Sequence, residues 1–109
     1  MTETASEGDD DVRYLDLSAF QRDVLLVLYQ FESRDTESYG LAIKRQLEER
    51  YAHSVNHGRL YPNLDKLVEW GLAERGQIDE RTNRYTLTER GRALLEAQAE
   101  RLDCLLEED

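Results

Sequence analysis

The chain has 109 residues, of which 35% are charged and 39% hydrophobic, which predicts one soluble globular domain with a highly charged surface. Its longest apolar run, Val24 to Tyr29, is too short to span a membrane, and residues 1–11 lack the apolar core of a secretion signal, so we expect an intracellular, cytoplasmic protein. The single cysteine excludes an intrachain disulfide and a cysteine-based zinc cluster.

The net charge of -10 is unevenly distributed. Residues 1–37 hold ten acids against three bases, and residues 96–109 hold six against one. Residues 38–95, with eight acids and ten bases, are slightly basic. Many carboxylates with only two lysines beside twelve arginines indicate a protein of a salt-rich cytoplasm. An acidic surface without such adaptation is the alternative.

The first half of the chain predicts an acidic disordered arm over residues 1–13, followed by a single domain over residues 14–109. Apolar residues at steps of three and four predict an amphipathic helix over 17–31, with Ser18 as a possible N-cap. Ser38 is expected to cap a second helix over 38–50. A third helix is predicted over 56–70 and ends before Gly71.

After Gly71 the period changes to that of strands, which predicts a hairpin over residues 72–87 with a loose turn at 79–83. A last helix is predicted over 88–106. This order predicts a mainly α (α+β) fold, a winged helix-turn-helix with three helices, a two-stranded β-hairpin wing and a C-terminal dimerisation helix.

In such a fold the third helix enters the major groove of DNA, and its N-terminal residues reach the base edges. Arg59 and Asn56 suit this role because Arg can donate two hydrogen bonds to guanine and Asn can make two with adenine. Wing residues contact phosphates or the minor groove. The predicted DNA-binding residues, all between Ser38 and Thr88, are Ser38, Tyr39, Asn56, His57, Gly58, Arg59, Tyr61, Asn63, Lys66, Arg81, Thr82, Asn83 and Arg84.

Pro62 lies inside the third helix, and its ring crowds the carbonyl of Gly58. We therefore expect a bend or a tightened first turn. The alternative is a helix that begins near Pro62, with residues 56–61 as a loop.

Three elements resemble the PadR family of transcription regulators: Tyr39-Gly40, the segment Gly58-Arg59-Leu60-Tyr61-Pro62-Asn63-Leu64, and the segment Tyr85-Thr86-Leu87-Thr88-Glu89-Arg90-Gly91. They occur in family order within residues 17–106. With its acidic ends, the chain is similar to haloarchaeal PadR-like regulators, one of which governs an oxidative-stress response. The resemblance implies a homodimer that binds a pseudo-palindromic operator in double-stranded DNA through residues 56–61 and the wing. The chain lacks the large C-terminal effector domain of longer members, so a dedicated small-molecule pocket is not expected.

A heptad-like seam on the last helix predicts a two-fold dimer interface, to which the first helix also contributes. The expected interface residues are Phe20, Val24, Val27, Phe31, Leu95, Gln98, Leu102 and Leu105. The alternative is that this seam packs only within its own subunit.

Two residue types suggest weaker sites. Cys104 is expected to be an inert, partly buried thiol, with a redox switch as the alternative. His53 and His57 are four residues apart, but without further clustered ligands they indicate a zinc site only weakly. We expect no metal site and no cofactor, apart from salt cations that bridge carboxylates to DNA phosphates.

The predicted function is therefore a DNA-binding transcription regulator. A winged-helix module that binds a protein instead of DNA is the alternative. An enzyme is not expected, because no nucleophile–base pair, phosphate loop or metal cluster is visible.

Overall fold

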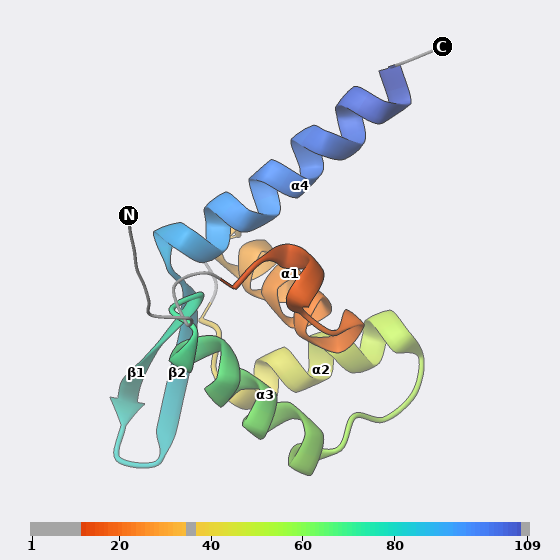
Figure 1. The fold of residues 1–109 in the computed structure, drawn as a ribbon. Helices are drawn as coiled ribbons and strands as arrows, with labels where there is room; N and C mark the ends of the chain where they lie inside the picture. The colour runs from red at the N-terminus through yellow and green to blue at the C-terminus, as the bar shows by residue number, and fades with distance from the viewer. Residues whose placement is uncertain (1–11, 35–36, 108–109) are drawn as a thin grey trace.

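A computed structural model describes residues 12–34 and 37–107 and has the predicted winged helix-turn-helix fold (Figure 1). A 3-10 helix at Tyr14–Asp16 precedes three helices that surround a single core. A two-stranded antiparallel hairpin and a long last helix follow. The elements are α1 (Ala19–Ser33), α2 (Gly40–Tyr51), α3 (His57–Glu69), β1 (Ala73–Asp79), β2 (Thr82–Leu87) and α4 (Glu89–Glu107).

The helix α1 begins in a capping box. The Ser18 hydroxyl accepts a hydrogen bond from the Gln21 amide at 3.1 Å, and the Gln21 side-chain oxygen accepts one from the Ser18 amide at 2.9 Å. These two bonds satisfy backbone donors that a helix start leaves unpaired. The helix α1 then packs against α2, α3, α4 and β2.

The apolar face of α1 is buried by this packing. Phe20, Val24, Val27 and Phe31 are 4%, 0%, 0% and 6% exposed, and all four belong to the core. The prediction that they contribute to a dimer interface is therefore wrong. An apolar stripe shows that a helix face is buried, but it does not show whether its own chain or a second copy covers it.

The start of α2 differs from its prediction. The helix begins at Gly40 after an uncapped Tyr39, so Ser38 is not its N-cap. The Ser38 hydroxyl instead donates a hydrogen bond to the carbonyl of Tyr85 in the wing, and the Tyr85 amide donates to the Ser38 carbonyl at 2.9 Å. Tyr39 also forms an isolated antiparallel bridge with Arg84. The two residues before α2 thus lie beside β2, joined to it by an isolated bridge and not as a third strand.

The wing turn is tighter than predicted. The strands pair from Ala73 opposite Leu87 to Asp79 opposite Thr82, with an irregularity before Asp79. Only two residues, Glu80 and Arg81, remain unpaired between the strands. A carboxylate oxygen of Asp79 accepts a hydrogen bond from the Arg81 amide at 2.9 Å, which holds the turn and lowers the pKa of Asp79.

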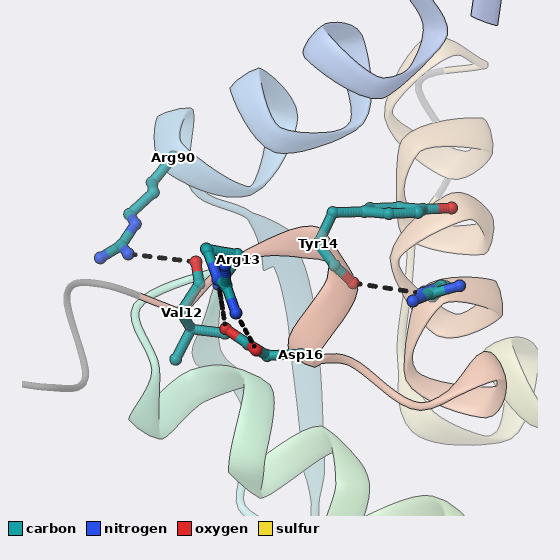
Figure 2. Close-up of polar contacts among 6 residues, drawn as sticks. Val12, Arg13, Tyr14, Asp16 and Arg90 are labelled. Carbon is teal, nitrogen blue, oxygen red and sulfur yellow. Dashed lines mark hydrogen bonds and ion pairs between the residues drawn. The ribbon is translucent and has the colours of Figure 1, made fainter. Parts of the chain in front are cut away.

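The segment before α1 packs onto the rest of the fold (Figure 2). The Arg90 side chain in α4 donates to the carbonyl of Val12 at 3.5 Å, and Arg22 in α1 donates to the carbonyl of Tyr14 at 3.2 Å. Arg13 pairs with Asp16 at 3.0 Å. The arm predicted over 1–13 is therefore wrong for Val12 and Arg13, and its remaining residues lie outside the described ones.

The helix α4 leaves the body of the molecule, and its second half extends away from the other elements (Figure 1). Leu102, Leu105 and Leu106 are 52%, 55% and 74% exposed. Cys104 is also exposed, so the prediction of a partly buried thiol is wrong for this chain taken alone. Within residues 12–34 and 37–107, no helix is both long enough and apolar enough to cross a membrane.

Tyr51 makes stability sensitive to alkaline pH. Burial and the hydrogen bond that its hydroxyl donates to Asp23 at 2.6 Å raise its pKa to about 12. Because the unfolded chain loses this proton near pH 10, its contribution to stability is complete below pH 10 and is lost between about pH 10 and 12. In urea titrations from pH 9 to 12, the Tyr51→Phe variant should lose less stability than the wild type. Parallel pH profiles would contradict this assignment.

Candidate nucleic-acid interface

The start of α3 is held in a tight turn. The Asn56 side chain accepts a hydrogen bond from the Gly58 amide at 2.6 Å and caps the helix. The Asn56 carbonyl accepts from the amides of both Arg59 and Leu60 at 3.0 Å. The bond to Arg59 spans three residues, so the first turn is tightened as expected from Pro62. The alternative of a loop over residues 56–61 is wrong, because the helix already begins at His57.

Two faces of α3 separate clearly. Leu60, Leu64 and Leu67 are each 0% exposed and lie in the core. The outward face consists of the exposed residues His57, Gly58, Arg59, Pro62, Asp65, Lys66 and Glu69. The core residues anchor the helix, so the outward face is available to a ligand along most of the length of α3.

Two predicted contact residues on α3 have structural partners. Asn63 donates to the carbonyl of Arg59 at 2.7 Å and accepts from the Gln21 side chain at 2.8 Å, which ties α3 to α1. The guanidinium carbon of Arg59 lies 4.0 Å from the centre of the Phe20 ring, a cation–π distance. Both ends of the Asn63 amide thus make one hydrogen bond within the fold, and its role as a DNA contact stays a prediction. Arg59 stays exposed but leans towards α1.

His57 and Tyr61 stack on the outer side of α3, with ring centres 5.5 Å apart and planes 5° from parallel. The Tyr61 ring passes so close to Gly40 that a Cβ there would overlap it. Burial against α2 raises the pKa of Tyr61. This packing fixes the side chain of Tyr61 between α2, α3 and the wing.

A groove of about 650 Å³ opens between the start of α2, Tyr61 and the wing, and we call it the α2–wing groove. Five predicted contact residues line it, and they are Tyr39, Tyr61, Arg81, Thr82 and Asn83. It is also lined by Glu37, Gly40, Leu41, Ile78, Asp79 and Tyr85, which the sequence analysis did not assign to the site. Leu41 and Ile78 are each 42% exposed. The sequence signal for Leu41 and Ile78 is an apolar side chain on an otherwise polar helix face or at a strand end.

Two other predicted residues lie away from this groove. Ser38 is 4% exposed and its hydroxyl is bonded to Tyr85, so its assignment as a DNA contact is corrected. Arg84 alternates with Asn83 and Tyr85 along β2 and lies on the opposite face of the hairpin. There its guanidinium pairs with Glu37 at 3.3 Å.

The surface formed by α3 and the wing has few available cations. Asp65 on the outward face of α3 is neutralised by Arg75 of β1 at 2.9 Å. Lys66 lies 5.8 Å from the Trp70 ring, and neither it nor Arg81 makes an ion pair with the residues that the structure describes. Together with Arg59, these two cations are the ones best placed to meet an anionic ligand.

No candidate metal centre accompanies this surface. In the described part of the chain, His, Cys, Asp and Glu side chains form no group of three that could hold a metal ion. His53 stacks on Tyr51 at 5.3 Å, away from the His57–Tyr61 pair.

Known proteins with similar sequences and folds support one family. The model of the transcriptional regulator PadR-like family matches residues 27–97. RosR from Halobacterium salinarum is 47% identical, with 86% of this chain and 82% of that chain covered and a TM-score of 0.71. A complex structure of RosR, hsRosR-S1, is also 47% identical, with 86% of this chain and 80% of the RosR chain covered and a TM-score of 0.72.

More distant structures share the fold alone. A PadR-like transcription factor from Bacteroides fragilis is 23% identical, covers 80% of this chain and 85% of its own, and has a TM-score of 0.62. A search among curated proteins returns no match.

Proposed function

The chain belongs to the PadR-like family of transcriptional regulators, and from that premise we propose that it acts as a homodimer on a pseudo-palindromic operator in double-stranded DNA. The observation that carries the proposal is the outward face of α3 beside the α2–wing groove, which together form one continuous edge of the molecule. An exposed recognition helix flanked by a wing suits a major groove and the adjacent phosphates.

The proposed contacts divide into two groups. The capped start of α3 presents Asn56, His57 and Gly58 to base edges, with Arg59 beside them. The phosphate contacts are Lys66, the groove residues Tyr39 and Tyr61, and the wing residues Arg81, Thr82 and Asn83. Leu41 and Ile78 add apolar contact at the groove, to deoxyribose or to a thymine methyl group.

The proposed dimer uses α4. A hollow of about 400 Å³ lies between the outer face of α1 and the middle of α4, and Leu26, Tyr29, Leu95 and Leu102 supply most of its apolar lining. Gln98 lies in the same hollow, and Leu105 is exposed one turn further along α4. A second copy seated here would bury apolar surface that this chain leaves open and would supply the two-fold symmetry of a palindromic site.

The charge of the chain makes a prediction about salt. With a net charge of -10 and few available cations on the proposed DNA-binding surface, little of the affinity comes from released counterions. The similarity to a Halobacterium protein supports a salt-rich cytoplasm, in which ordinary electrostatic attraction is screened within about 3 Å. A role in a stress response stays a prediction from the family resemblance.

We expect the wild type to retard a selected genomic fragment in potassium-rich buffer, with a log–log salt slope shallower than about -8. The Lys66→Ala/Arg81→Ala variant should bind at least about tenfold more weakly, with a slope less negative by about 4, because each subunit of the dimer loses two phosphate contacts. Fluorescence anisotropy across salt concentrations measures both quantities. The matched control is Arg13→Ala/Arg34→Ala, which removes two exposed cations outside the proposed surface.

Two outcomes contradict the proposal. If no fragment is retarded at micromolar protein, the chain is better explained as a winged-helix module that binds a protein. If the control variant weakens binding as much as Lys66→Ala/Arg81→Ala does, the DNA-binding surface lies elsewhere.

A further inference from the structure

The end of α3 and the start of α4 meet at one junction, which consists of Gly71, Leu72, Thr88 and Gly91. Gly71 has a φ of 77°, in the left-handed region that favours glycine, and it ends α3. The Gly71 amide donates to the carbonyl of Val68 at 3.0 Å, and the Leu72 amide donates to that of Leu67 at 2.9 Å. These bonds make the end of α3 rigid.

Thr88 connects this end of α3 to α4. Its hydroxyl donates to the carbonyl of Gly71 at 2.7 Å and accepts from the amide of Gly91 at 3.0 Å. Its own amide donates to the carbonyl of Leu72 at 3.2 Å. One side chain therefore caps the first turn of α4 and bonds that turn to the last turn of α3.

Gly91 allows α4 to approach the segment between α3 and β1. It is the one residue of α4 that is fully buried, and a Cβ at this position would overlap the carbonyl oxygen of Leu72. The same Cβ would lie 3.1 Å from the Leu87 side chain. Because the obstructing atom belongs to the backbone, no side-chain rotation relieves the overlap.

Other contacts hold α4 to α1 and not to α3. Arg92 makes two hydrogen bonds to Glu32, at 2.8 and 2.7 Å, and Tyr29 donates to Glu96 at 3.1 Å. The Thr88–Gly91 junction thus holds the start of α4 to the segment that follows α3, while the α1 contacts hold its next turns.

We propose that Thr88 and Gly91 are positioning residues, which set the angle between α4 and α3 and thereby the half-site spacing that the dimer accepts. The inference rests on the proposed function, because α4 carries the dimer contacts and α3 the DNA contacts. A change of angle at the junction is transmitted along α4, so the separation of the two recognition helices changes with it. Neither residue touches DNA in this proposal.

The central variant is Thr88→Asp, with Thr88→Ser as its matched control. Aspartate is a strong N-cap and accepts from the Gly91 amide, but it has no proton to donate to the Gly71 carbonyl. Serine keeps both hydrogen bonds. The pair therefore separates the effect of the junction hydrogen bond from the stability of α4. Thermal unfolding is measured to check that both variants fold.

Binding is measured on four DNAs: the selected operator, versions with its half-sites two base pairs closer and two base pairs further apart, and an isolated half-site. We expect Thr88→Asp to change half-site affinity by less than about threefold while it loses most of the preference for the native spacing. Thr88→Ser should keep the wild-type preference. An unchanged spacing preference in Thr88→Asp would overturn the inference.

A second measurement does not depend on DNA. Cys104 is the only cysteine, is exposed and lies on α4, so a spin label there can be paired with a label at Glu69→Cys on the end of α3. Dilution with unlabelled Cys104→Ser chain leaves distances within one subunit. Thr88→Asp should broaden or shift this distance distribution, whereas Thr88→Ser should reproduce the wild type. If the wild type binds no DNA, the proposed function fails, and the distance distribution still tests the junction.

Discussion

Replacing Leu102 by glutamate is expected to weaken the proposed dimer by more than about 100-fold and to remove detectable operator binding at nanomolar protein. Leu102 is 52% exposed in this chain and lines the hollow between α1 and α4. Burying a leucine contributes about 1.5–3 kcal/mol, and a two-fold interface loses this contribution twice. The introduced carboxylate adds a cost of desolvation at the same place.

The oligomeric state is measured by sedimentation at several concentrations, and operator affinity by fluorescence anisotropy. Ala97→Glu is the matched control, because it introduces the same charge at an exposed position about 140° around α4 from Leu102. A Leu102→Glu protein that stays dimeric would show that the interface lies elsewhere. A wild type that is monomeric at micromolar concentration would contradict the dimer itself.

Phe20→Ala is expected to lower the free energy of unfolding by about 3–5 kcal/mol, the range for removing a buried phenylalanine. Phe20 is 4% exposed, its ring lies 6.3 Å from that of Tyr51, and the Arg59 guanidinium stacks on it. Since a small domain has about 5–15 kcal/mol of stability in total, this variant is near the limit of folding.

Urea unfolding of Phe20→Ala at several protein concentrations distinguishes core from interface. The loss should be the same at every concentration if Phe20 belongs to the core of one chain. If the loss of stability disappears at high protein concentration, Phe20 belongs to the dimer interface and not to the core of one chain. Leu15→Ala is the control, because Leu15 is 74% exposed and its truncation should change stability by less than about 0.5 kcal/mol.

Local patterns in the sequence determined much of this protein. Leu60, Leu64 and Leu67 are spaced as one face of the helix predicted over 56–70, and the structure places all three in the core. Pro62 predicted the tightened first turn, because its effect acts on the carbonyl four residues back. The period of a helix and the effect of a proline depend on residues within one or two turns, so both can be predicted from the sequence. The family resemblance added the expectation of a homodimer on a pseudo-palindromic operator.

Only the tertiary structure decided which partner each side chain has. Phe20 and Leu102 belong to similar apolar stripes, but the first is covered by its own chain and the second is open. The Ser38 hydroxyl is bonded to a residue 47 positions away in the sequence, and the Asn63 amide to one 42 positions away. The register of β2 turned Arg84 towards Glu37 and away from the α2–wing groove. Each of these outcomes depends on residues distant in sequence, and a local pattern carries no information about them.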